Sequence, residues 1–520
     1  MQQTEISPLK GDAPRLSAFQ LAHALLVCLT GFQEGYYLCV VNSCLTPIQR
    51  DLQLCYPCEG GSSDAALAEC TCTSKSLAVA ILMVGAAAGG LTGGALADRF
   101  GRRSIVLLTA ALFVAVAVMC TAAQPGTVWL FFVGRIGTGL CVGAGGTASV
   151  AFIAETAPRE FRGALIQAVE VSLCVGCVVA TLVALALGDH RWRATMAVPG
   201  FIAVVQLLGG YLFLYESPAW LEAQGRVGEA RAAASALGLS SAHEKTTMRG
   251  AGKAVLAGVR FSRSLAMLPT GSDAVAARAA AQSGRHVRAL AIAVGCAVAH
   301  DALAANAVLY YSRDILQSAG VGNALLAELF VGIVKCAGVI VTLLLVERTG
   351  RKPLLLVGTF GAMIGHAGMG WAFATEPHSQ PLALASLFVF IFFWDLSWAG
   401  LMFMVAAEVL PLPIRGIGLG LVATVYWSGS FLWAFYLQEL FEAVGTSTTF
   451  FMLSATTCGS LLFVALFVPE TSEPHDAAAV RPQAVASKLP ARSGSLASFA
   501  HILAEGRETD TTDANAEGET

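Results

Sequence analysis

The stretch Gly94-Ala-Leu-Ala-Asp98-Arg99-Phe-Gly101-Arg102-Arg103 decides the fold, because a diluted copy follows it as Leu345-Val-Glu347-Arg348-Thr-Gly350-Arg351-Lys352. Each copy joins two long apolar segments. In each copy an acid at the end of one segment stands four residues before a basic residue, and the two acids are 249 residues apart. The repetition indicates that one structural design is used twice.

The apolar segments are long enough to cross a membrane. Apolar residues make up 56% of the 520 residues and charged residues only 13%, against about 25% charged in ordinary soluble domains. A bilayer-spanning helix needs about 20 mostly apolar residues. The sequence therefore predicts an all-α membrane protein with twelve transmembrane helices, at 17–41, 75–97, 104–123, 127–154, 163–187, 195–215, 287–311, 324–346, 353–374, 381–407, 416–440 and 446–468.

Two further pairs of motifs repeat at nearly the same period. Segments 155–162 and 408–415 share a seven-residue spacing from acid to base and lie 253 residues apart, while Glu216 and Glu470 lie 254 apart. Two similar halves in the same orientation are one of the known transporter architectures, and such proteins hold their substrate near the membrane midplane between the halves.

The repeat divides the chain into segments. We expect a six-helix half at 17–215 and another at 287–468, joined by a middle loop at 216–286. The tails at 1–16 and 469–520 are polar, and the second is acidic, so we expect no folded structure there.

The basic residues of the loops predict the orientation. Nine Lys and Arg residues fall in the middle loop, and such residues accumulate on the cytoplasmic side. Counting spans puts the two repeated motifs and both termini on that same side. The plasma membrane is the default address.

Four cysteines lie in the loop at 42–74, which would face the other side of the membrane: Cys55, Cys58, Cys70 and Cys72. In an oxidising compartment they could form two disulfides, with three possible pairings. A metal site at the Cys-x-x-Cys spacing is the alternative.

Polar residues inside the predicted spans need a reason, because a charge at the centre costs about 2.5–3.5 kcal/mol on insertion scales. They mark functional positions or helix packing, and they are Glu34, Glu170, His300, Asp301, Asn306, Lys335, His366 and Asp395.

Taken together, several motifs resemble those of the sugar porter family of the major facilitator superfamily, over about residues 31 to 471. The matching stretches are 94–103, 134–139, 155–163, 215–221, 306–311, 347–351, 408–416 and 469–471. The resemblance implies the two-half fold, alternating access, and transport of a hexose or polyol.

The resemblance also implies a cytoplasmic gate, in which ion pairs across the two halves hold the inner mouth shut. The gate candidates are Asp98, Arg102, Arg103, Glu155, Arg162, Glu216, Glu347, Arg351, Glu408 and Arg415. The alternative is that these residues only set topology and cap helices.

The substrate positions depart from the family pattern. Glutamines and asparagines of the family's sugar site are replaced by Glu170, His300-Asp301, Lys335 and Tyr426, whereas Asn306 keeps its identity. Trp394 is a further candidate, since aromatic faces suit sugar rings. Proton-coupled members carry an acid where this chain has Tyr37, so that assignment does not transfer, and Glu34 is a possible substitute.

Two explanations of these replacements stay open. Glu170 and Lys335 come from opposite halves and could neutralise each other, which favours a charged or zwitterionic substrate. Alternatively, His300 and Asp301 could relay a proton, because histidine titrates near neutral pH. A third possibility is that all these groups only fix helix packing.

The leading hypothesis is a transporter of a small polar solute, most simply a hexose or polyol, with proton coupling possible at Glu34, His300 and Asp301. An organic ion or amino acid carrier is the alternative on the same scaffold, and a non-transporting sensor is the alternative of another class. No nucleotide or metal motif is found in a soluble part, so we expect no enzyme activity, no cofactor and no nucleic acid partner, with a monomer as default.

Overall fold

The described part of the chain is mostly helical. The computed structural model describes residues 16–54, 72–158, 161–239, 273–411 and 415–471, and no strand occurs among them. All of these residues belong to one unit that ends at Thr471. Twelve helices in this part of the chain are long and apolar enough to cross a membrane, which confirms the predicted number.

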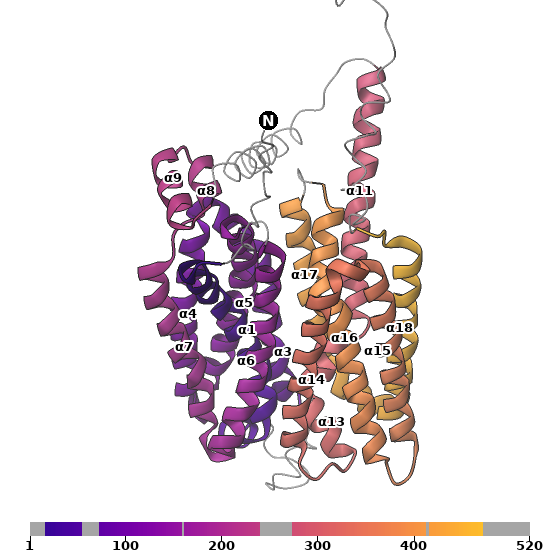
Figure 1. The fold of residues 1–520 in the computed structure, drawn as a ribbon. Helices are drawn as coiled ribbons and strands as arrows, with labels where there is room; N and C mark the ends of the chain where they lie inside the picture. The colour runs from indigo at the N-terminus through magenta and orange to yellow at the C-terminus, as the bar shows by residue number, and fades with distance from the viewer. Residues whose placement is uncertain (1–15, 55–71, 159–160, 240–272, 412–414, 472–520) are drawn as a thin grey trace, which may run out of the picture. The chain divides into compact units, whose positions relative to one another are not determined.

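The helices form two sets that are consecutive in the chain. The first half, indigo to magenta in Figure 1, consists of α1 (Ala18–Leu52), α3 (Thr73–Phe100), α4 (Arg102–Ala122), α5 (Val128–Thr156), α6 (Arg162–Leu187) and α7 (Trp192–Phe213). The short helices α8 (Pro218–Ala223) and α9 (Val227–Ala236) follow it.

The second half, salmon to yellow in Figure 1, has the same number of spans. It consists of α11 (Asp273–Asp301), α12 (Ala305–Tyr310), α13 (Ser312–Ser318), α14 (Ala324–Thr349), α15 (Arg351–Ala374), α16 (Gln380–Val409), α17 (Arg415–Val444) and α18 (Thr446–Phe467). The helices α3 and α14 pack across to α17 and α6 of the other half.

The two repeated motifs form matching turns between consecutive helices. Gly101 and Gly350 have φ angles of +97° and +87°, a backbone region that favours glycine. The end of the bundle that contains these turns is called the arginine end below. The opposite end, where α1 ends and α3 begins, is called the cysteine end.

Close helix packing depends on glycine in the first half. A Cβ atom at Gly35 of α1 would overlap the Leu173 carbonyl of α6, and one at Gly139 of α5 would overlap the Leu82 carbonyl of α3. Small residues allow such backbone contact between membrane helices, which accounts for the abundance of glycine within the spans.

Helix α1 continues further than the sequence predicted. We expected it to end near residue 41 and a loop to begin at 42, yet the helix runs to Leu52. The prediction was wrong because the polar residues that follow residue 41 continue the helix instead of starting a loop. Asn42 and Ser43 are instead buried, where Asn42 donates to the Ser312 hydroxyl (3.1 Å) and Ser43 donates to Glu328 (2.8 Å).

Further polar contacts join the halves at the cysteine end. Lys75 of α3 lies 3.4 Å from the Asp314 carboxylate of α13, and Arg313 donates to the Ser43 carbonyl at 2.6 Å. Lys75 is only 1% exposed. The halves are therefore tied together at this end by buried hydrogen bonds and an ion pair.

The seventh span is broken in the middle. Helix α11 ends at Asp301 and α12 begins at Ala305, with Ala304 in the left-handed region at φ +49°. Breaks inside a membrane free backbone carbonyls that other groups have to satisfy. Here Thr456 donates to the Ala302 carbonyl (2.7 Å) and the His366 Nε2 bonds the Leu303 carbonyl (3.0 Å).

Candidate functional site

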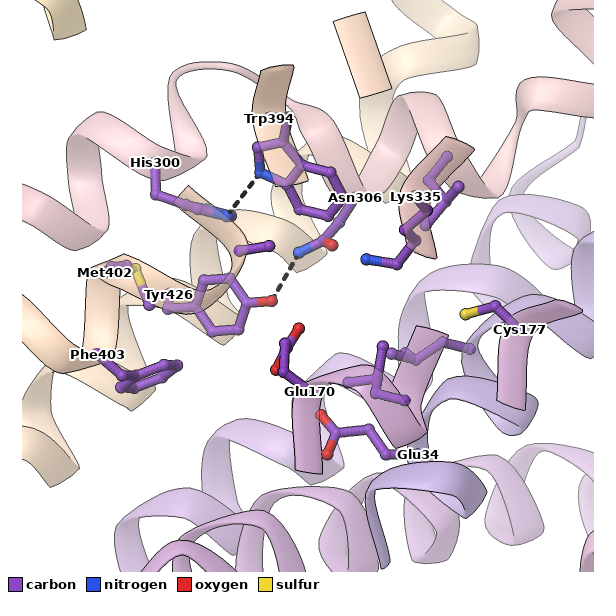
Figure 2. A pocket seen from close by; sticks show the side chains of 14 residues that line it. Glu34, Glu170, Cys177, His300, Asn306, Lys335, Trp394, Met402, Phe403 and Tyr426 are labelled. Carbon is purple, nitrogen blue, oxygen red and sulfur yellow. Dashed lines mark hydrogen bonds between the residues drawn. The ribbon is translucent and has the colours of Figure 1, made fainter. Parts of the chain in front are cut away.

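A cavity lies between the two halves, and its walls come from seven helices. Six of the seven substrate residues predicted from sequence line it, and Asp301 does not. Figure 2 shows the carboxylates on the first-half side facing the amide, aromatic and basic groups of the second half. The lining residues are Glu34, Leu38, Glu170, Leu173, Cys177, His300, Asn306, Leu309, Lys335, Trp394, Ala399, Met402, Phe403 and Tyr426.

Lys335 has a partner within its own half. Its Nζ lies 2.8 Å from the Asp395 Oδ1 of α16 and 4.5 Å from the centre of the Trp394 ring. Both members of the ion pair are buried, at 2% and 0% exposure. The pairing of Lys335 with Glu170 considered from the sequence is therefore replaced by a pair between neighbouring helices α14 and α16.

His300 is held between an indole and a carboxylate. The Trp394 Nε1–H donates to the His300 Nε2 at 3.1 Å, as Figure 2 shows, while the His300 Nδ1 lies 3.6 Å from Asp301. Because Nε2 accepts a hydrogen bond, the proton of the neutral ring stands on Nδ1, on the side of Asp301. The imidazole therefore connects the cavity to the buried carboxylate behind it.

Asp301 lies behind the cavity wall. Its carboxylate accepts from the Ser430 hydroxyl at 3.2 Å and packs against Gly429, where a Cβ atom would overlap it. Asp301 thus connects to the cavity through His300, and through Ser430 to Asn306, rather than directly.

Asn306 organises the second-half wall. Its amide nitrogen donates to the Tyr426 hydroxyl at 3.0 Å and to the Ser430 hydroxyl at 2.8 Å. Its position just after the break in the seventh span places the side chain at the level of His300. The amide oxygen and the tyrosine hydroxyl provide neutral hydrogen-bonding groups for a polar ligand.

Glu34 and Glu170 form the opposite wall. They extend from α1 and α6, and Figure 2 shows both carboxylates directed toward the cavity. The two carboxylates are electrostatic neighbours of each other and of Lys335. No hydrogen bond or ion pair within the described residues involves either carboxylate.

Each half builds the same cluster at the arginine end. In the first half the Arg102 guanidinium pairs with Glu155 at 3.1 Å and with Asp98 at 2.8 Å, and Ser217 also donates to Glu155. The Glu216 carboxylate accepts from the backbone N–H of Arg102 at 2.9 Å. An acid at this place stabilises the positive N-terminus of α4.

The second half repeats these contacts. Arg351 pairs with Glu408 at 3.2 Å, and the Thr471 hydroxyl also donates to Glu408. Glu470 accepts from the backbone N–H groups of Arg351 and Lys352 at 3.0 Å. Glu470 was not among the predicted gate residues, although its match to Glu216 in the repeat could have identified it.

The remaining gate candidates have less defined surroundings. Arg103 donates to the Tyr211 carbonyl at 2.8 Å, and Arg162 is half-buried at the start of α6. The side chains of Glu347 and Arg415 lie outside the described residues. All the ion pairs given above for the gate candidates lie within one half, whereas the gate was expected to join the two halves, so its role stays a prediction.

Of the four loop cysteines, the structure describes only Cys72, which takes part in a disulfide. Cys55, Cys58 and Cys70 lie outside the described residues, so the pairing stays a prediction. No group of three or more potential metal ligands occurs in the part of the chain that is described.

Arg135 is a buried residue to which sequence reasoning gave no role. Its guanidinium, 2% exposed, donates to the carbonyls of Tyr37 (3.1 Å), Ala78 (3.3 Å) and Val79 (3.3 Å). The charge is thus held by backbone dipoles of α1 and α3, next to the tyrosine that stands where proton-coupled members of the resembled family carry an acid.

Two similar six-helix halves around a central polar cavity define a transporter of the major facilitator type. The family described as "Sugar (and other) transporter" matches residues 23–475, and the chain belongs to this family. It is therefore a multi-pass membrane transporter and not an enzyme.

The relatives of the chain agree with this assignment. It is 27% identical to plastidic glucose transporter 4 of Arabidopsis thaliana, over 90% of this chain and 81% of that protein. It is also 27% identical to the major myo-inositol transporter IolT of Bacillus subtilis, over 76% and 83% of the two chains.

Solved structures that are similar to the chain show the same fold. The proton:xylose symporter XylE from E. coli superposes with a TM-score of 0.71 at 22% identity, over 88% of this chain and 98% of that one.

Proposed function

We propose that this protein moves a hexose-sized, hydroxylated solute across the membrane by alternating access, with the cavity between the halves as its binding site. The observation that carries the proposal is the wall formed by Asn306, Tyr426 and Trp394, which combines neutral hydrogen-bonding groups with an aromatic face. Relatives named for glucose and inositol support the same solute class.

The orientation belongs to this proposal. The arginine end and both termini face the cytoplasm, and the protein is located in the plasma membrane. The basic loops support this orientation. The clusters around Arg102 and Arg351 act as a gate, and the contacts of these arginines change when the inner mouth opens.

Proton coupling is a second part of the proposal. His300 and Asp301 carry the proton, and Glu34 is the alternative group. The 3.6 Å contact between the imidazole and the carboxylate supports this assignment.

Uptake into proteoliposomes tests the proposed function. Purified protein should take up labelled glucose or myo-inositol, and an inward proton gradient should raise the accumulated level. In Asp301→Asn the gradient should no longer drive accumulation, while exchange persists. If the variant still accumulates solute like the original protein, Asp301 does not carry the proton. If neither solute enters or competes, the proposed solute class is wrong.

A further inference from the structure

The basic groups of the cavity are already neutralised or uncharged. Lys335 is paired with Asp395 at 2.8 Å, and its ammonium lies over the Trp394 ring. His300 accepts the Trp394 N–H on Nε2, so the ring is neutral in this arrangement. Neither group is therefore free to balance an additional negative charge.

The two acids of the first half are electrostatic neighbours of Lys335 but form no ion pair with it. Glu34 and Glu170 line the cavity side by side, and no hydrogen bond or ion pair within the described residues holds either of them. A charge within a membrane span costs about 2.5–3.5 kcal/mol on insertion scales, and two neighbouring carboxylates repel each other as well. A proton on either carboxylate relieves these costs, and so does a ligand that brings a positive charge to this wall.

The opposite wall has different chemistry. Asn306, Tyr426 and Trp394 present an amide, a phenol hydroxyl and an aromatic ring, which suit hydroxyl groups and the apolar face of a ring. A ligand that fits both walls at once carries a cationic group on one side and hydroxyl groups on the other.

We propose that the transported solute is a hydroxylated amine of hexose size, such as an amino sugar, whose ammonium lies between Glu34 and Glu170. This inference rests on the proposed function, since it names the solute class of the same cavity. The three N–H donors of an ammonium can serve both carboxylates, and hydrogen bonds between charged groups are about twice as strong as neutral ones. Because such a solute touches both halves, its binding can be coupled to their relative movement.

Other solutes fit the same walls less well. A neutral hexose leaves the two carboxylates unbalanced. An anion meets two like charges on one wall and a lysine that is already paired on the other. An amine without hydroxyl groups leaves the Asn306 amide oxygen and the Tyr426 hydroxyl without a ligand partner.

Competition in proteoliposomes tests the inference. D-glucosamine and D-glucose differ by an ammonium in place of one hydroxyl, so the pair isolates the charge. At mildly acidic pH, glucosamine should compete with labelled glucose or myo-inositol roughly tenfold better than unlabelled glucose does. One or two added charge-assisted hydrogen bonds account for a difference of this size. Cyclohexylamine tests whether the hydroxyl groups are needed, and it should compete poorly.

Two single-site variants locate the effect. Glu170→Gln and Glu34→Gln keep the shape of the side chain and remove its charge, so each should bring the affinity for glucosamine down toward that for glucose. Glu439→Gln, at an exposed position of α17, makes the same change away from the cavity and should preserve the preference. Size-exclusion profiles show whether each variant is folded. If one of the two cavity variants does not fold, the other one alone tests the inference.

The outcomes separate the inference from the proposed function. If glucose competes as well as glucosamine, or if the preference survives in both cavity variants, the amine inference is overturned while sugar transport stands. If cyclohexylamine competes as well as glucosamine, the hydroxylated class is wrong. If neither sugar competes at all, the proposed function fails together with the inference.

Discussion

At the scale of single residues, the buried pair of Lys335 and Asp395 neutralises the ammonium on the cavity wall. With 2.8 Å between Nζ and Oδ1 and almost no exposure of either side chain, the pair resembles other buried ion pairs, in which loss of one partner costs about 3–5 kcal/mol. Asp395→Asn should therefore lower the Tm of the purified protein markedly.

A double variant is the control for this prediction. Lys335→Met combined with Asp395→Asn removes both charges, and it should be more stable than Asp395→Asn alone, because no uncompensated ammonium remains. Equal Tm values for Asp395→Asn and the original protein would show that the pair does not hold α14 against α16.

The residues of this site could be predicted from the sequence, but their partners could not. Charged side chains within apolar spans are visible in the sequence, so Glu170, His300 and Lys335 could be singled out. Which groups neutralise one another depends on which helices are neighbours. Asp395 could not be given a role from the sequence, because its position beside Lys335 follows only from the packing of α14 on α16.

At the scale of elements, the broken seventh span depends on groups from other helices. His366 of α15 is fully buried, and its Nε2 bonds the Leu303 carbonyl at 3.0 Å. His366→Leu should leave that carbonyl unsatisfied at a cost of about 1–3 kcal/mol. His366→Gln, which keeps a donor, should lose less. Thermal unfolding in detergent measures both, and a leucine variant as stable as the glutamine variant would refute the role.

The break itself could not be predicted from the sequence. Residues 302–304 read Ala-Leu-Ala, which are good helix formers, and neither glycine nor proline marks the position. The interruption is held by tertiary contacts from α15 and α18. The extension of α1 to Leu52 was missed for a similar reason, since its polar residues are buried against the other half.

The repeated clusters at the arginine end belong to the same scale. If they act as gates, Arg351→Ala should lower the transport rate by roughly fivefold. This corresponds to a loss of about 1 kcal/mol of interaction free energy. The amount of protein at the surface should change less. Asp98→Asn should act in the same direction. Transport assays normalised to the amount of surface protein measure this, and a loss explained by abundance alone would leave these residues a purely structural role.

At the scale of the whole molecule, transport requires the halves to move against each other, and two native cysteines can report that movement. Gly332 of α14 faces Val178 of α6. Four residues further along each helix, Cys336 of α14 and Cys174 of α6 are neighbours across the two halves. Oxidation of both thiols to a disulfide, with peroxide reduced to water, would join the two halves covalently.

We expect such a disulfide to stop transport. Treatment with peroxide or copper phenanthroline should abolish most of the uptake, and dithiothreitol should restore it. The variants Cys174→Ser and Cys336→Ser should each keep their uptake after the same oxidant treatment. If the oxidant lowers uptake by these variants as much as it lowers uptake by the original protein, the oxidised group is elsewhere.

The twelve helices and two halves were predictable at this scale, because span length and the repeat near 250 residues are properties of the sequence alone. The polar contacts that close the cysteine end were not, since Lys75 and Asp314 come from distant segments that only the folded bundle brings together.

The central claim is that one cavity serves both sides of the membrane in turn. Counterflow tests it most directly: proteoliposomes are loaded with an unlabelled hexose or amino sugar, and labelled solute is supplied outside at low concentration. Alternating access predicts a transient overshoot of label inside, which disappears after Cys174–Cys336 oxidation. If labelled solute enters vesicles preloaded with unlabelled solute no faster than it enters empty vesicles, alternating access through this cavity is contradicted.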